Sequence, residues 1–123
     1  MRPLMIDACG WVALVDGHLH LDEALRTTVG TCQMVILPEV RQELDRLRSE
    51  RRHGLLLDLL DQRAETLPST EEEGHPDDVI VDWTHRTNGI VLTVDRALKR
   101  RILEAGGAVL EIRSDRRAHL VEL

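Results

Sequence analysis

The stretch IVLTVDRAL, residues 90–98, joins a continuous apolar run to the start of an expected helix. Residues 90–94 lack the polar alternation of a half-exposed strand, so they predict a strand covered on both faces. Asp95 follows that strand directly, and a helical pattern follows Asp95. Because the same order of apolar strand and then helix recurs along the chain, the sequence predicts an α/β fold with a parallel sheet.

The remaining elements follow from periodicity and from residues that break helices. Strands are expected at residues 3–7, 34–37, 90–94 and 108–112, and a further short strand could lie at 119–123. Helices are expected at residues 11–15, 21–28, 38–50, 53–65, 78–87 and 96–105. Together they predict a three-layer α/β/α arrangement with a central, mainly parallel sheet of four to five strands.

Turn signals support these boundaries. Asn88-Gly89 and Gly106-Gly107 each stand between an expected helix and an expected strand, where a left-handed residue ends the helix. Pro38 opens its helix at a position that needs no N–H donor. Residues 68–76 are acidic and rich in helix breakers, which predicts an exposed loop.

Length and composition narrow the class of protein. The 123 residues predict one domain spanning 1–123, and the content of 42% hydrophobic and 31% charged residues is typical of soluble globular proteins. No apolar stretch approaches the roughly 18 residues of a membrane helix, and the start does not resemble a signal peptide, so we expect a cytoplasmic protein without a membrane segment. Cys9 and Cys32 are too few for a disulfide framework and predict reduced thiols.

Four acidic residues lie beside apolar segments that are far apart in the sequence: Asp7, Glu43, Asp77 and Asp95. Asp7 and Asp95 close expected strands, and ligands bind at the carboxyl ends of strands in open α/β sheets. Carboxylates gathered at one edge repel one another unless a cation or proton lies between them. If the fold brings the four together, they form a site of hard oxygen ligands for a divalent cation.

Each acid also has a purely structural explanation. Asp7, Asp77 and Asp95 could cap the helices that follow them, and Glu43 could be a solvated helix residue. Asp78 stays open as the alternative to Asp77, because the two are adjacent at the start of one expected helix.

Helical geometry distinguishes Glu43 from Glu39 in the helix expected at residues 38–50. At about 100° per residue, Glu43 falls roughly 65° from the centre of the apolar stripe and Glu39 roughly 105° from it. The stripe consists of Val40, Leu44 and Leu47. Glu43 therefore borders the buried face, while Glu39 is expected to face water.

The segments around the four acids resemble the motifs of the PIN-domain family of metal-dependent ribonucleases, nearly end to end. They are MIDAC at residues 5–9, VILPEVRQEL at 35–44, PDDVI at 76–80 and LTVDRAL at 92–98. The resemblance implies a PIN-like fold and an endoribonuclease that holds Mg(II) or Mn(II) with the four acids. It also implies Thr93 as a supporting hydroxyl, and products with a 5′ phosphate and a 3′ hydroxyl.

The first motif departs from the family pattern. The family usually has a hydroxyl residue and then Asn or Ser after the first Asp, whereas Ala8 and Cys9 occupy these positions here. The departure predicts the loss of a polar contact that would help to position a metal ligand.

Substrate and partners follow from the same comparison. RNA phosphates are expected to bind cations that follow two of the acids on their helices, namely Arg46, Arg96, Lys99 and Arg100. Trp11 and Trp83 are the sole aromatic residues, which argues against base stacking and favours recognition of RNA shape or backbone.

The leucine-rich segment at residues 55–60 has more apolar coverage than one buried stripe needs. It could be internal, form a homodimer face, or receive a partner's helix, as VapC-type toxins receive their antitoxins. Residues 46–63 and 113–117, rich in arginine, look more like the archaeal and ribosomal-RNA-processing branch. The expected roles are therefore a toxin-type nuclease with an antitoxin or an RNA-processing nuclease with a protein partner, in either case a homodimer.

Two other classes of function stay open. A non-catalytic PIN-like scaffold that binds RNA or protein fits the departure at Ala8 and Cys9 and the net charge of −6. A receiver domain or a phosphatase is a third interpretation. Against it, Ala8 and Cys9 leave no second Asp close to Asp7, and no expected strand ends on a lysine.

Overall fold

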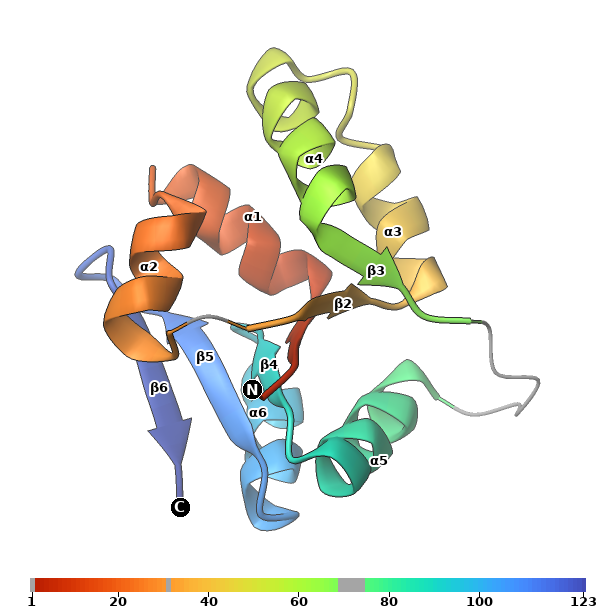
Figure 1. Cartoon of the computed structure of the whole chain (residues 1–123), viewed down its shortest axis with the longest axis vertical. Coiled ribbons are helices and arrows are strands. Elements are labelled where there is room, and N and C mark those ends of the chain that lie inside the picture. Colours follow the sequence, from red (N-terminus) through yellow and green to blue (C-terminus); the bar gives the residue numbers. More distant parts are fainter. Residues whose placement is uncertain (1, 31, 69–74) are drawn as a thin grey trace.

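A computed structural model describes residues 2–30, 32–68 and 75–123, and within them six strands form one sheet in the order β3-β2-β1-β4-β5-β6 (Figure 1). The strands β1 to β5 are parallel, and β6 is antiparallel to β5. Their bounds are β1 Leu4–Ile6, β2 Met34–Ile36, β3 Ala64–Thr66, β4 Ile90–Leu92, β5 Ala108–Ile112 and β6 Ala118–Glu122. The expected α/β class and mainly parallel sheet are confirmed.

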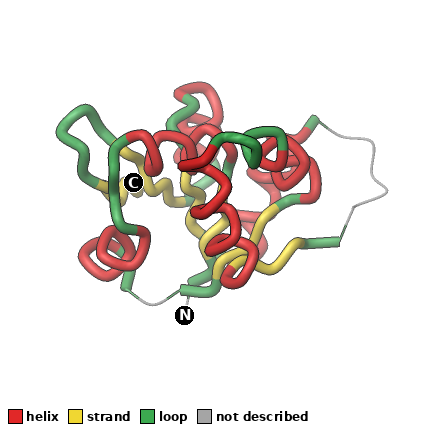
Figure 2. The backbone as a smooth tube through the Cα atoms, turned by 90° about the horizontal axis from the view of Figure 1, so that it is seen from above, coloured by secondary structure: helices red, strands yellow, loops and turns green. Residues whose placement is uncertain are grey.

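Helices cover both faces of this sheet. They are α1 Ala8–Asp16, α2 Leu21–Thr28, α3 Pro38–Asp45, α4 Arg51–Arg63, α5 Pro76–Thr87 and α6 Arg96–Glu104. From β1 through β2 to β3, each new strand is added on one side of β1, whereas β4 and then β5 are added on the other side. Because parallel crossovers are right-handed, this reversal places α1–α4 on one face of the sheet and α5 and α6 on the opposite face. Figure 1 shows α5 and α6 below the strands with α1, α3 and α4 above them, and Figure 2 shows the strands enclosed by helices.

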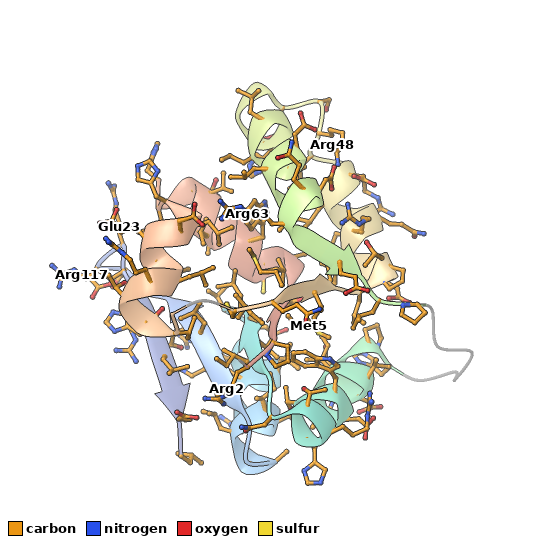
Figure 3. The ribbon with its side chains drawn as sticks, viewed as in Figure 1. Arg2, Met5, Glu23, Arg48, Arg63 and Arg117 are labelled. Atoms are coloured by element: carbon orange, nitrogen blue, oxygen red, sulfur yellow. The ribbon has the colours of Figure 1, made fainter. Side chains whose placement is uncertain are left out.

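The core lies along the central strands. The side chains of β1 and β4 are buried, as expected for strands covered on both faces, and β1 adds Met5 at the centre of the molecule (Figure 3). Trp11 and Leu14 of α1 pack on one side, and Leu98 and Ile102 belong to the same hydrophobic core from α6. Arg48 lies beside α3 and α4, and Arg117 lies at the left edge of the view (Figure 3).

Strand β3 was not expected, because the sequence predicted a helix through residue 65. Helix α4 ends at Arg63, and Ala64 is extended and pairs with Met34 of β2. Glu65 and Thr66 are exposed at the edge of the sheet, so they carry no apolar pattern that would reveal a strand. The sheet consequently has six strands rather than four to five.

Other boundaries moved for local reasons. Asn88 and Gly106 adopt positive φ values of 55° and 82°, as the turn signals predicted.

Helix α3 ends at Asp45 and not at residue 50, and turns lead into α4. In α4, Leu57 and Leu60 are buried while Leu55 is 71% exposed, so the helix is not internal on all sides. Most of the acidic loop expected at 68–76 lies outside the described residues.

Candidate active site

The order of the sheet reverses between β1 and β4. These two strands are neighbours, with Ile6 beside Leu92, but the chain leaves β1 toward one face and β4 toward the other. In open α/β sheets, ligands bind outside the carboxyl ends of the strands at this kind of switch point. Asp7 follows β1 and Asp95 lies just beyond β4, so two of the four predicted acids flank it.

The carboxylate of Asp7 accepts hydrogen bonds from side chains that follow β1 and β4. Its Oδ2 atom accepts hydrogen bonds from the Thr93 hydroxyl at 2.8 Å and from the Cys9 thiol at 3.2 Å. Asp7 occupies the N-cap position of α1 but makes no side-chain cap hydrogen bond. Both hydrogen bonds end on Oδ2, and among the described residues none donates to Oδ1.

Thr93 connects Asp7 to Asp95. Its side chain is fully buried, and its hydroxyl donates to Asp7 while accepting from the backbone N–H of Asp95 at 3.2 Å. A single hydroxyl therefore fixes the loop after β4 relative to the residue after β1.

Cys9 makes the polar contact that the sequence predicted to be lost. Its Sγ lies 3.2 Å from Asp7 Oδ2 and 3.3 Å from the Thr93 hydroxyl. Burial is the largest influence on its pKa and raises it above the ordinary thiol value, so the thiol is protonated at neutral pH and can donate. At this position, a thiol provides a contact to the carboxylate that a hydroxyl or amide could also provide.

Substituting Cys9 separates this contact from simple packing. Cys9→Ser retains a donor toward Asp7 and is expected to keep the affinity for Mn(II) within about threefold. Cys9→Ala removes the donor and is expected to weaken the affinity about tenfold, because removing a group that orients a metal ligand typically costs at least that much affinity. Calorimetric titration with Mn(II) checks both variants. Equal affinities for Cys9→Ala and the unmodified protein would show that the thiol does not orient Asp7.

Gly10 permits the close approach of α1 to β4. A Cβ at this position would lie 2.3 Å from the Leu92 carbonyl oxygen and 2.8 Å from the Thr93 backbone nitrogen. The first turn of α1 can therefore lie against the end of β4, which brings Asp7 and Cys9 to Thr93. The sequence reasoning missed Gly10, although a glycine inside a helical pattern is a signal of this kind.

Asp95 is a helix cap, as one of its alternative explanations proposed. Its Oδ1 accepts from the backbone N–H of Ala97 at 2.9 Å and of Leu98 at 3.2 Å, both in the first turn of α6. Both cap hydrogen bonds end on Oδ1, so Oδ2 lies outside the cap. The capping explanation and the ligand explanation are therefore compatible for this residue.

Glu43 lies on the face of α3 that points toward α1. It is exposed, but together with Cys9 and Val94 it lines a pocket of about 610 Å³ between the two helices. Val40 and Leu44 of the predicted apolar stripe are buried. Glu43 thus shares a pocket with Cys9, the residue that contacts the Asp7 carboxylate.

Asp77 and Asp78 lie in the first turn of α5, on the opposite face of the sheet. The N-cap of α5 is His75, whose Nδ1 accepts from the Asp77 backbone N–H at 3.2 Å, so the capping explanation for Asp77 is wrong. Asp78 forms an ion pair with Arg101, and the hydrogen bond from Arg101 holds the pKa of Asp78 below its usual value. The Asp77 side chain is 28% exposed, and that of Asp78 is 59% exposed.

The predicted acids do not form a closed cluster. Within the described ranges, no three His, Cys, Asp or Glu side chains are grouped closely enough to hold a metal ion. Asp7 and Asp95 are linked through Thr93, Glu43 lies on a pocket shared with Cys9, and Asp77 lies on α5. The donor set nevertheless consists of carboxylates, with oxygens on Asp7 and Asp95 outside the hydrogen bonds described above, and it suits a hard divalent cation such as Mg(II) better than zinc.

The four predicted substrate-binding cations differ in their surroundings. Lys99 Nζ lies 2.5 Å from Glu111, which also binds Arg113. Burial opposes the ionisation of Glu111, but the two cations outweigh it and hold its pKa below the usual value. In the part of the chain that is described, Arg46, Arg96 and Arg100 make no ion pair, so they are better placed than Lys99 to bind phosphate.

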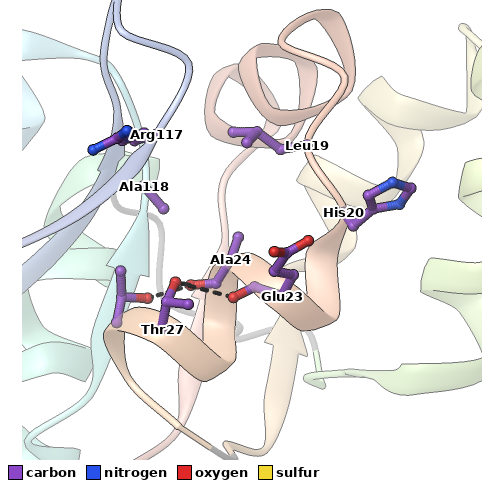
Figure 4. A pocket seen from close by; sticks show the side chains of 8 residues that line it. Leu19, His20, Glu23, Ala24, Thr27, Arg117 and Ala118 are labelled. Carbon is purple, nitrogen blue, oxygen red and sulfur yellow. Dashed lines mark hydrogen bonds between the residues drawn. The ribbon is translucent and has the colours of Figure 1, made fainter.

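A separate pocket of about 400 Å³ lies between α2 and the start of β6 (Figure 4). The hydroxyls of Thr27 and Thr28 there donate to carbonyls of α2 itself, Thr27 to Glu23 at 3.0 Å and Thr28 to Ala24 at 2.5 Å. Its lining includes none of the four acids and none of the predicted substrate-binding cations. This pocket is therefore separate from the predicted site residues.

None of the helices in the described segments has the length and apolarity that a membrane crossing requires. A search of curated proteins finds no match to this chain. Among solved structures, the chain resembles the PIN domain endonuclease Utp24, with a TM-score of 0.79 and 26% sequence identity, over 98% of this chain and 92% of that one. A family model described as "PIN like domain" matches residues 4–115, and the chain therefore belongs to the PIN-like domain family.

Proposed function

We propose that the protein is a metal-dependent endoribonuclease that hydrolyses RNA phosphodiester bonds. The observation that supports this most is the hydrogen-bonded connection from Asp7 through Thr93 to Asp95 at the switch point of the sheet. It occurs in a chain of the PIN-like family that resembles a solved endonuclease. The proposed ligands of Mg(II) or Mn(II) are Asp7, Glu43, Asp77 and Asp95.

The chain's own residues would have distinct roles in cleavage. Thr93 and Cys9 orient the Asp7 carboxylate, and the α6 cap holds Asp95. Arg46, Arg96 and Arg100 bind the phosphates on either side of the cleaved bond. A divalent cation, when bound, supplies an activated water and neutralises charge on the phosphodiester. The expected products carry a 5′ phosphate and a 3′ hydroxyl.

Asp77 is the proposed ligand from α5 in preference to Asp78. Because Arg101 already neutralises Asp78, its carboxylate would have to leave an ion pair to bind a metal. Asp77→Asn is therefore expected to lower the RNA cleavage rate by about a hundredfold, while Asp78→Asn, which removes only an exposed ion pair, changes it by less than about threefold. Steady-state kinetics of the two variants check this, and the reverse order of effects would assign the role to Asp78.

A second candidate function is a non-catalytic PIN-like scaffold that binds RNA or protein. It is favoured by the absence, within the described residues, of a three-ligand metal cluster. For either function, we propose a homodimer, with an antitoxin or an RNA-processing protein as the partner.

Cleavage of structured and single-stranded RNA by the purified protein tests the proposal. We expect cleavage with Mn(II), its loss when a chelator is added, and its return when Mn(II) is restored in excess. Mapping of the new ends checks for a 5′ phosphate. Cleavage that survives chelation contradicts the metal mechanism, and calorimetric binding of RNA without cleavage under any of these conditions supports the scaffold.

A further inference from the structure

An apolar pocket opens directly beside the candidate active site. It lies between α1 and α3, has a volume of about 610 Å³, and is lined in part by Val94, a residue between Thr93 and Asp95 that is 37% exposed. The other apolar side chains that line it are Ala8, Val12, Ala13, Leu44 and Leu47.

The pocket extends away from the cleavage edge along α1. Ala8 and Cys9 lie at its sheet end and Asp16 lies two turns further along the helix, a distance of about 12 Å at 1.5 Å per residue. Cys9 contacts the Asp7 carboxylate, so a group in the pocket would be adjacent to a phosphodiester positioned by that carboxylate. The pocket therefore begins at the proposed cleavage point and leads away from it.

The charged residues of the pocket suit a nucleotide. Arg46 makes no ion pair in the described part of the chain and can bind a phosphate. Glu43 is already a proposed metal ligand, but Asp16 is an exposed carboxylate at the other end of the pocket and can accept hydrogen bonds from the amino and ring N–H groups of a base. Between them, the walls are aliphatic, which suits the two faces of a planar ring.

We propose that this pocket binds the nucleobase next to the cleaved phosphodiester, with aliphatic side chains on its faces and the Asp16 carboxylate on its hydrogen-bonding edge. The inference rests on the proposed nuclease function and adds a specificity subsite to it. Such a pocket needs no aromatic stacking partner, which fits a chain whose Trp11 and Trp83 are both buried in the core. Bases that carry amino groups bind more tightly than uracil, because the pocket offers a carboxylate acceptor.

The test measures binding and does not depend on cleavage. Guanosine 5′-monophosphate, uridine 5′-monophosphate and ribose 5-phosphate are titrated into methyl-labelled protein, and the NMR signals of Val12, Ala13 and Leu47 are followed. Guanosine monophosphate is expected to shift these signals with a Kd at least about tenfold below that of ribose 5-phosphate, because only guanosine monophosphate carries a base that the pocket can bury. Uridine monophosphate lies between the two.

Two variants and a matched control locate the site. Ala13→Leu fills the pocket and is expected to raise the Kd for guanosine monophosphate at least about tenfold, whereas Gln62→Leu, which adds the same side chain on exposed α4, changes it less than about twofold. Asp16→Asn reduces the preference for guanosine over uridine monophosphate. This second variant leaves the pocket volume nearly unchanged, so it tests the inference even if Ala13→Leu folds poorly.

The outcomes separate this inference from the proposed function. Methyl shifts of equal size with ribose 5-phosphate and guanosine monophosphate overturn the base pocket, and so does the absence of any shift, which would leave the pocket to a protein partner. Nucleotide binding here without RNA cleavage contradicts the nuclease but supports the pocket. RNA cleavage without methyl shifts contradicts the pocket alone.

Discussion

The Asp7→Asn variant is expected to lose about three orders of magnitude in the rate of RNA cleavage, equivalent to about 4 kcal/mol of transition-state stabilisation. Asparagine retains the shape of the side chain and can still accept from Thr93 and Cys9, so the local hydrogen bonds persist. The change removes the negative charge that the proposed cation needs. Single-turnover kinetics at saturating Mn(II) measure the effect on the chemical step.

Asp82→Asn is the matched control for this substitution. Asp82 is exposed on α5 and pairs with Arg86 on the same helix, so the same change in charge occurs away from the switch point. It is expected to leave the cleavage rate within about twofold, because an exposed ion pair contributes little. If both variants cut RNA as fast as the unmodified protein, Asp7 is not a metal ligand and the proposed mechanism fails.

Gly10→Ala is expected to cause the largest loss of stability among the substitutions considered. The added methyl group would meet backbone atoms of Leu92 and Thr93, which cannot rotate away as a side chain can. Overpacking of this kind costs about 1–3 kcal/mol of stability. We expect a cost at the upper end of that range, because α1 and β4 would both have to shift. Urea denaturation measures the change in the free energy of unfolding.

Ala13→Ser provides the control for Gly10→Ala. It adds one heavy atom to the same helix, but on the side that faces the open pocket. We expect a change below about 0.5 kcal/mol, as is usual away from packed contacts. A change below about 0.5 kcal/mol for Gly10→Ala as well would show that α1 tolerates the added methyl group, and that Gly10 does not set the distance between α1 and β4.

The sequence predicted the central strands because burial on both faces requires a continuous apolar pattern, which can be recognised without a structure. Residues of β1 and β4 are apolar without alternation, since both faces are covered. Strand β3 lacks such a pattern, because Glu65 and Thr66 are exposed. In the sequence, residues 61–65 resemble a continuation of helix α4. An edge strand of this length is specified by its pairing with β2, which is a tertiary contact.

For the candidate site, the sequence predicted the placement of residues and not their contacts. The positions of Asp7 and Asp95 after β1 and β4 follow from local pattern, whereas the assignment of Glu43 in place of Glu39 as a metal ligand stays a prediction. The hydrogen bond from Cys9 to Asp7 depends on the position of Thr93, 84 residues away from Cys9, and on the approach that Gly10 permits. Similarly, the engagement of Lys99 by Glu111 depends on how α6 lies on β5.

The cap that Asp95 forms has a consequence for how activity could be lost in proteins of this kind. Asp95 contributes to folding through the first turn of α6, so under the proposed nuclease function a relative that had lost RNA cleavage would still have a reason to retain it. Asp7 makes no cap hydrogen bond, and its carboxylate would only add unbalanced charge beside a buried threonine if no cation bound there. Asp7 is therefore the more informative residue for separating working nucleases from inactive relatives, whereas Asp95 would persist in both.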